Sequence, residues 1–131
     1  IIDERLETLG DMTRIISDGI AEEINIKINR VGGLTRAAQI RDLALAHGIR
    51  MAIMPTGGTV LADTDATHLA QTIPEAFRLR LWSCQDMLTE DPAPGWGVRT
   101  HRGKMAIGSE PGLGVAPDPA WLGQPFATYE A

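Results

Sequence analysis

The even spacing of short apolar segments constrains this chain more than any other feature. Segments that are typical of buried strands end near four residues that are 24, 28 and 27 positions apart: Asp3, Lys27, Pro55 and Trp82. Stretches with helical periodicity lie between them, at about 11–17, 35–47 and 60–72, and Thr35 is the expected N-cap of the second. Strands and helices that alternate in this way predict βα units with a parallel sheet. Four such units are half of an eight-unit barrel, which takes about 250 residues. The chain also begins Ile-Ile-Asp-Glu without Met, and we expect it to be a piece of a longer protein.

The composition of the chain changes near residue 92. Residues 1–91 contain 2 Pro and 7 Gly, whereas residues 92–131 contain 6 Pro and 7 Gly in less than half that length. We therefore predict α/β barrel units over 1–91 and an irregular C-terminal arm over 92–131. A hairpin is expected where two short segments flank the turn 101–103. Four of the six aromatic residues lie in the arm and are expected to pin it to a surface: Trp96, Trp121, Phe126 and Tyr129.

Charge and composition exclude several classes of protein. The chain carries 17 acidic and 12 basic residues, a net charge of −5, which argues against nucleic-acid or anionic-membrane partners because both require a basic patch. No apolar run reaches the roughly 18 residues of a membrane span. Cys84 is the only cysteine, so an internal disulfide framework is excluded and a reducing, cytoplasmic location is expected.

The strand that contains Lys27 is the most informative segment. Alternation over 24–29 puts three Ile on one face and Asn25, Lys27 and Asn29 on the other. A parallel sheet covered by helices on both sides needs two apolar faces, so a strand with one polar face indicates a barrel. Lys27 would then point inward near the C-terminal end of the barrel, where such enzymes carry out their chemistry. An edge strand with Lys27 in water explains the same pattern.

Two further groups follow strand ends on the same expected rim. Asp3 and Glu4 could hold a hard cation through one carboxylate while the other orients a neighbouring cation; a strand-end Asp is also a common cap. The Thr56-Gly57-Gly58 turn lets the backbone approach an anion and adds a hydroxyl, although paired glycines are ordinary in βα turns. No Gly-Lys-Ser/Thr follows, so it is not a phosphate loop.

Trp82 ends the last expected strand. An indole at a barrel mouth can hold a substrate ammonium by a cation–π contact worth about 0.5–2 kcal/mol, and core packing is the alternative. The three histidines lack metal-ligand spacing: His47, His68 and His101.

Asp3-Glu4 followed by Lys27 in Ile-Lys-Ile-Asn-Arg-Val-Gly-Gly-Leu-Thr resembles the mandelate racemase/muconate lactonizing enzymes of the enolase superfamily, in the muconate lactonizing branch. The likeness continues to Pro-Gly-Leu-Gly at 111–114. Within the branch, the segments 54–58 and 81–87 are most similar to cis-3-hydroxyproline dehydratases. The resemblance implies the last four units of a (β/α)₈ barrel, with a C-terminal arm that would pack on a capping domain. That domain, the first four strands and two further metal ligands have no counterpart in this chain.

The resemblance also implies a role for each candidate residue. Asp3 would be one carboxylate ligand of an essential Mg²⁺, and Glu4 beside it would orient Lys27. Lys27 would be an acid/base on one face of the substrate α-carbon, and the superfamily is known for a Lys or His base combined with Mg²⁺. The remaining candidates would contact the substrate: Thr56, Gly57 and Trp82.

The function implied is that of a Mg²⁺-dependent lyase which removes the proton α to the carboxylate of a small substrate. Dehydration of cis-3-hydroxy-L-proline to Δ1-pyrroline-2-carboxylate is the expected reaction, in a full-length homo-oligomer. A racemase or epimerase of proline-like or amino-acid substrates and a cycloisomerase use the same half-site. A non-catalytic, barrel-derived interaction module is the alternative from another class. A barrel wall and a metal would lower the pKa of Lys27 and Glu4 would raise it, so the sequence leaves the net direction open.

Overall fold

A computed structural model describes residues 1–129 of the chain and contains a three-stranded parallel sheet. The strands are β1 (Glu23–Ile26), β2 (Arg50–Ile53) and β3 (Arg78–Leu81), in the order β1-β2-β3. The expected first strand is represented by one parallel bridge between Ile2 and Ile24. Since all pairs are parallel, the carboxyl ends of the strands lie at one edge of the sheet, as the spacing predicted.

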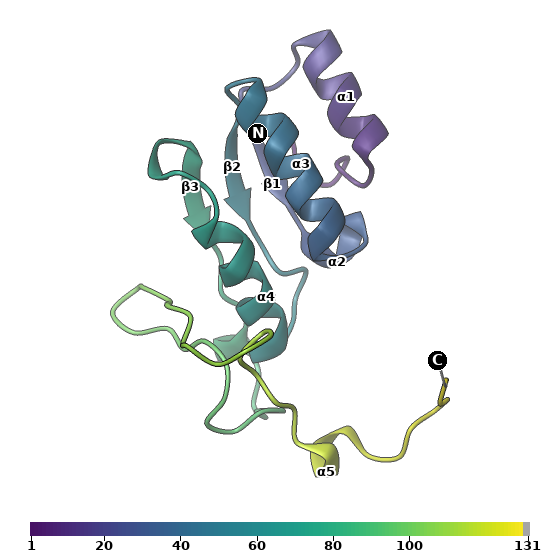
Figure 1. Cartoon of the computed structure of the whole chain (residues 1–131), viewed down its shortest axis with the longest axis vertical. Coiled ribbons are helices and arrows are strands. Elements are labelled where there is room, and N and C mark those ends of the chain that lie inside the picture. Colours follow the sequence, from purple (N-terminus) through teal and green to yellow (C-terminus); the bar gives the residue numbers. More distant parts are fainter. Residues whose placement is uncertain (130–131) are drawn as a thin grey trace.

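The helices fill the intervals between the strands. They are α1 (Leu9–Asp18), α2 (Ile28–Val31), α3 (Leu34–Ala46), α4 (Val60–Gln71) and α5 (Pro119–Leu122), with 3₁₀ turns η1 (Glu75–Phe77) and η2 (Gln85–Met87). Thr8 and Asp11 form a capping box at the start of α1, and Gly19 ends it in a left-handed conformation. Figure 1 shows α3 and α4 lying along the sheet, with α1 beside α3.

The two faces of the sheet differ as the alternation at Lys27 predicted. Four strand residues on the helix-covered face are completely buried, at 0% exposed: Ile24, Ile26, Met51 and Ile53. The opposite face carries Asn25, Ala52 and Arg80, which are paired across the three strands. A sheet with one helix-covered apolar face and one face with polar groups is the arrangement of a barrel wall.

Two local expectations are wrong around residues 27–35. β1 ends at Ile26, and the chain turns at once into α2, so Asn29 is exposed on a helix and does not extend the strand face. Gly33, not Thr35, is the N-cap of α3. Gly32 and Gly33 have φ of 92° and 106°, and this left-handed pair reverses the chain between the two helices in a way that other residues rarely adopt.

The arm after residue 91 is irregular and extends away from the sheet (Figure 1). In place of a longer hairpin it contains a tight turn, with Arg102 and Gly103 at φ of 50° and 73° and a bridge between His101 and Lys104. Its aromatic side chains are exposed in the described chain: Trp96 and Trp121 are nearly half exposed and Phe126 and Tyr129 almost fully. Trp121 donates a hydrogen bond to Glu90, and the pinning of the arm by the other three stays a prediction. Within residues 1–129, no helix has the length and apolarity to cross a membrane.

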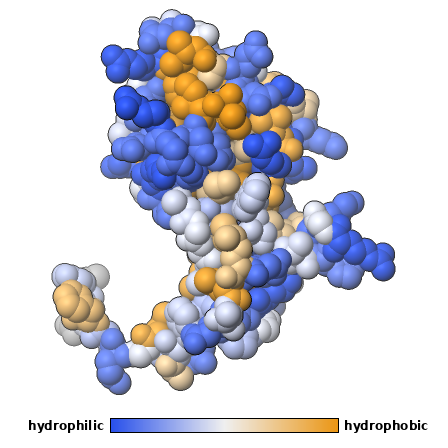
Figure 2. Space-filling view, turned by 180° about the vertical axis from the view of Figure 1, so that it is seen from behind, coloured by the Kyte–Doolittle hydropathy of each residue, from blue (hydrophilic) through white to orange (hydrophobic). Residues whose placement is uncertain are grey.

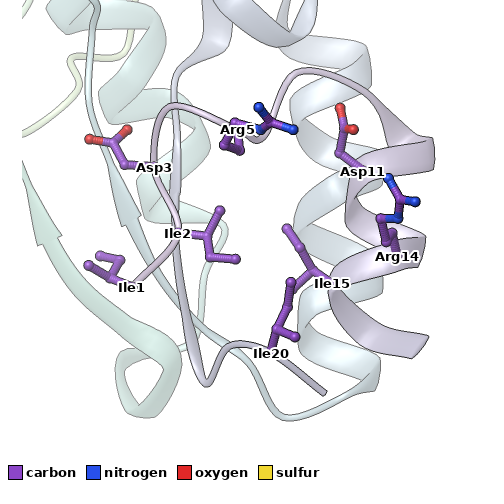
Figure 3. A pocket seen from close by; sticks show the side chains of 8 residues that line it. All are labelled: Ile1, Ile2, Asp3, Arg5, Asp11, Arg14, Ile15 and Ile20. Atoms are coloured by element: carbon purple, nitrogen blue, oxygen red, sulfur yellow. The ribbon is translucent and has the colours of Figure 1, made fainter. Parts of the chain in front are cut away.

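The end of the molecule that carries the N-terminus is open. Figure 2 shows apolar side chains exposed over the N-terminal segment and α1, and Ile1 and Ile20 are 59% and 58% exposed. A hollow of about 390 Å³ lies between that segment and α1. In Figure 3, Ile2 points into it toward Ile15, whereas Asp3 points to the other side of the segment.

Candidate active site

Lys27 lies at the carboxyl end of β1 and is buried. Its extended backbone (φ −108°, ψ 106°) forms the junction between β1 and α2, and the residue is only 5% exposed. A buried ammonium requires compensation by acceptors or opposite charge. The strand fixes the side chain on the face opposite the Ile residues, as the alternation predicted.

Two carboxylates from the neighbouring strand end meet the ammonium. Lys27 Nζ lies 2.8 Å from Asp3 Oδ1 and donates a hydrogen bond to Glu4 Oε1. Asp3 Oδ1 is buried and has no aligned hydrogen bond, so its contact with Lys27 is chiefly ionic. Arg30, on α2, forms a salt bridge with the other oxygen of Glu4. Glu4 therefore bridges two cations. Arg30, three residues beyond Lys27, was not among the predicted site residues.

These contacts determine the pKa of Lys27. Burial lowers the pKa of Lys27, but the Asp3 contact and the Glu4 hydrogen bond outweigh it, so the pKa lies above its usual value. The hydrogen bond from Lys27 and the contact with Arg30 in turn lower the pKa of Glu4. In this arrangement Lys27 is a protonated donor at neutral pH.

The donor set fits one ligand of a hard cation. Asp3 offers a carboxylate at the rim, with a buried oxygen that lacks an aligned hydrogen bond, and Mg²⁺ prefers such oxygens. Among residues 1–129, no three His, Cys, Asp or Glu side chains are grouped closely enough to hold a metal ion. Asp3 is therefore suited to be one ligand, and the described part of the chain does not form a complete metal site.

The turn after β2 lies beside α2. Thr56 Oγ1 lies 2.6 Å from Asn29 Oδ1, and this contact joins the segments that follow β1 and β2. Gly57 has φ of 62°, and a Cβ built there would meet no atom within 4 Å. Gly57 thus permits the turn, while the structure contains no close backbone approach at this position.

Trp82 follows β3 directly and is half exposed. Its backbone N–H donates to Ile53 O at 3.0 Å, which extends the ladder by one residue. The side chain borders a small hollow of about 90 Å³ on the inner face of the sheet, which Asp3, Asn25, Met54 and Arg80 also line. Trp82 is therefore not a core residue of the described chain.

Two further residues near Trp82 were not among the sequence predictions, Arg80 on the inner face of the sheet and Asp63 on α4. Arg80 lies one layer below Trp82, and the alternation Arg78-Leu79-Arg80-Leu81 carries the signal for it. Asp63, on α4, is completely buried and binds the segment after Trp82 through four hydrogen-bond donors. An acid in the first turns of a helix is common, so nothing in the sequence indicates that Asp63 is buried.

Comparison with known families identifies the arrangement. A family model described as Enolase C-terminal domain-like matches residues 1–121. The chain belongs to this enolase family. The family assignment agrees with the parallel βα units and with Lys27 and Asp3 at adjacent strand ends.

The chain is also similar to individual proteins of this family. The chain is 36% identical over 129 residues to a cis-3-hydroxy-L-proline dehydratase of Roseibium aggregatum. A solved mandelate racemase/muconate lactonizing enzyme relative from Silicibacter pomeroyi is 55% identical, with a TM-score of 0.94. An enolase-superfamily member from Roseovarius nubinhibens, complexed with magnesium, is 50% identical with a TM-score of 0.93.

The match covers nearly all of this chain and about a third of each relative. Coverage is 98% of this chain in all three comparisons, and 35% of the dehydratase, 36% of the Silicibacter protein and 35% of the Roseovarius protein. This chain is thus related to hydroxyproline dehydratase and to mandelate racemase/muconate lactonizing enzymes over the barrel units and arm that it contains.

Proposed function

We propose that this chain supplies part of the active site of a Mg²⁺-dependent lyase that dehydrates cis-3-hydroxy-L-proline to Δ1-pyrroline-2-carboxylate. The observation that carries the proposal is the buried Lys27 ammonium, 2.8 Å from Asp3 at the carboxyl end of adjacent strands. The 36% identity to a cis-3-hydroxy-L-proline dehydratase supports the choice of substrate. The remaining barrel strands of the relatives would complete the site.

Lys27 is the acid/base group of this proposal. Removal of the proton α to the carboxylate and loss of the β-hydroxyl as water give the C2=C3 enamine, and transfer of the N–H proton to C3 converts it to Δ1-pyrroline-2-carboxylate. Lys27 takes or returns a proton on one face of the α-carbon. Glu4, held by Arg30, fixes the direction of the ammonium. Lys27 must release its proton before it can accept another, and the two acids beside it oppose that release.

Asp3 is the proposed Mg²⁺ ligand of this chain. A bound Mg²⁺ would supply positive charge beside the substrate carboxylate, where negative charge develops as the α-proton leaves. A relative complexed with magnesium supports this assignment.

Trp82 and the 56–57 turn are the proposed substrate contacts. The half-exposed Trp82 indole borders the same hollow as Asp3, so a ring nitrogen with positive charge can stack on it by a cation–π contact. Thr56 is exposed at the rim, where its hydroxyl can reach a polar group of the substrate.

Turnover of cis-3-hydroxy-L-proline tests the proposal. The protein with its complete barrel, supplied with Mg²⁺, should release one water per substrate and form Δ1-pyrroline-2-carboxylate, detected by mass spectrometry. Proline, betaines, dipeptides and a neutral sugar acid serve as the comparison set. A sugar acid as the best substrate would refute the dehydratase assignment, and racemisation of proline without dehydration would replace it by the epimerase alternative.

A further inference from the structure

Asp63 is a buried charge that the proposed chemistry does not use. It is 0% exposed, in the first half of α4, and none of the salt bridges in residues 1–129 involves it. A buried carboxylate is costly unless hydrogen bonds compensate its charge. The donors that surround Asp63 therefore indicate what the residue holds in place.

In the described part of the chain, every hydrogen-bond donor to the Asp63 carboxylate comes from residues 83–85. Asp63 Oδ2 accepts from Ser83 Oγ at 2.9 Å, from Gln85 N at 2.9 Å and from Gln85 Nε2 at 3.0 Å. Cys84 N lies 2.9 Å from Oδ1 and 3.1 Å from Oδ2. A carboxylate has enough lone pairs for these donors, whereas the amide of Asn would turn an NH₂ group toward N–H groups.

The segment bound by Asp63 begins one residue after Trp82. On its other side, Trp82 is fixed to the sheet by its hydrogen bond to Ile53 O. The backbone of Trp82 is therefore anchored before and after the residue, although the indole is half exposed. An anchored backbone restricts the directions in which an exposed side chain can point.

The same helix also holds the 56–57 turn. α4 begins after Thr59, whose hydroxyl caps it by accepting from Leu61 N, and Cys84 Sγ contacts Pro55 O at 3.6 Å. Both loops are thus attached to α4. The loop after β2 leads directly into the helix, and the loop after β3 is hydrogen-bonded to Asp63 on it.

We propose that Asp63 is a positioning residue that fixes the Trp82 indole and thereby sets the affinity for the substrate. It touches neither substrate nor reacting atoms and acts through the segment 83–85. The inference rests on the proposed function, in which Trp82 faces the substrate. It predicts an effect on KM and little effect on the proton transfer assigned to Lys27.

A double-mutant cycle with Trp82 tests this proposal in the complete protein, with cis-3-hydroxy-L-proline and Mg²⁺. Asp63→Asn should raise KM by up to about tenfold, the most that loss of the indole contact can cost, and change kcat by less than about threefold. Asp63→Asn in the Trp82→Leu background should raise KM no further, because the group through which Asp63 acts is absent. An equal rise in both backgrounds, or an unchanged KM, would overturn the proposal.

Asp65→Asn is the matched control. It makes the same charge change two residues along α4. The Asp65 carboxyl interacts with the backbone N–H of Ala66, but in the described part of the chain it forms no salt bridge and accepts no hydrogen bond from residues 83–85. KM and kcat of this variant should equal those of the parent. A KM effect as large as that of Asp63→Asn would attribute the result to helix charge and contradict a positioning role.

Two further measurements apply if Asp63→Asn fails to fold or the substrate is not turned over. Ser83→Ala removes one donor and should raise KM by a smaller factor, again only when Trp82 is present; an unchanged KM would refute the proposal. If no dehydration occurs in the parent protein, the proposed function fails, and ¹⁹F NMR of 5-fluorotryptophan protein decides the inference separately. The Trp82 resonance is assigned from its loss in Trp82→Leu. Asp63→Asn or Ser83→Ala should shift or broaden this resonance and leave the Trp121 resonance unchanged. An unchanged Trp82 resonance would overturn the positioning role of Asp63.

Discussion

At the scale of single residues, the buried charges of this chain are compensated in two different ways. Lys27 has acidic partners at close range, with Asp3 in ionic contact and Glu4 in a hydrogen bond. Asp63 has no ion partner in the described residues and is surrounded by donors from one short segment. The ion pair at Lys27 places groups that can exchange protons near the rim, whereas the hydrogen bonds to Asp63 fix the loop after β3.

Asp65 gives a pH dependence with a definite sign. Burial, with a contribution from the charge of Asp63, raises the pKa of Asp65 to about 6, against about 3.9 in an unfolded chain. The folded state thus favours the neutral acid, so this contribution to stability is complete below about pH 4 and is lost as pH rises through 6. Asp65→Asn cannot ionise, and we expect it to raise the free energy of unfolding by about 1 kcal/mol at pH 7.5, after allowance for solvent screening.

Urea unfolding of parent and Asp65→Asn at pH 4 and pH 7.5 checks this prediction. The difference between the two proteins should be small at pH 4 and appear at pH 7.5. A difference of the same size at both pH values would contradict the assigned pKa.

At the scale of elements, Gly97 determines how closely the arm lies on α4. A Cβ at Gly97 would lie 2.7 Å from Thr64 Oγ1 and 2.8 Å from Val60 Cγ2, and the same Thr64 hydroxyl accepts from Val98 N at 3.0 Å. Gly97→Ala should cost about 1 kcal/mol for its left-handed φ of 74° and a further 1–3 kcal/mol, about the cost of overpacking.

Gly95→Ala separates the two effects. Gly95 has a similar φ of 79°, and a Cβ there would meet nothing within 4 Å, so only the cost of about 1 kcal/mol is expected. Amide exchange at Val98 and urea unfolding measure both variants. Equal destabilisation by the two substitutions would mean that the arm does not depend on the close approach at Gly97.

Elements with a periodic apolar face are the ones that could be predicted well from the sequence. Ile24 and Ile26 alternate with Asn25 and Lys27, and this pattern is enough to predict the buried face of β1 and the direction of Lys27. The end of β1 is not predictable from alternation, because Ile28 continues the alternating pattern although it is the first residue of α2. The left-handed pair Gly32 and Gly33 follows α2 directly.

Side-chain contacts between segments far apart in the chain could not be predicted from the sequence. Glu4 and Lys27 could be linked through a family resemblance, but Arg30 completes that group through a salt bridge that no spacing rule indicates. Asp63 likewise depends on how α4 lies against the segment after β3. The aromatic residues of the arm are exposed in the described chain, and aromatic content alone does not specify the surface against which they pack.

At the scale of the whole molecule, the sheet has free edges. Among residues 1–129, β3 pairs only with β2, and beyond β1 there is one bridge at Ile2. The apolar hollow beside Ile1 and Ile20 adds to this open side (Figure 3). Unpaired edges and exposed apolar patches promote association, so a polypeptide of residues 1–131 alone should self-associate or aggregate.

Size-exclusion chromatography with light scattering, together with thermal unfolding, tests this prediction. Oligomers or aggregates that increase with concentration are expected for the 1–131 polypeptide. A monomer that unfolds cooperatively would contradict the view that these units are part of a larger barrel.

The central claim is that Lys27 is the acid/base group for a proton α to a carboxylate, and exchange of that proton in D₂O tests it most directly. In the complete protein with Mg²⁺ and cis-3-hydroxy-L-proline, Lys27→Ala should reduce α-proton exchange and dehydration by roughly 10²–10⁴-fold, the usual loss for one acid/base group. Lys27→Arg should be nearly as inactive, because a guanidinium stays protonated near neutrality. Circular dichroism and Mg²⁺ binding should be unchanged in both variants, since Lys27 is not a proposed ligand. Exchange and turnover at the parent rate in a folded Lys27→Ala protein would contradict the claim and leave Lys27 as a structural ion-pair partner of Asp3 and Glu4.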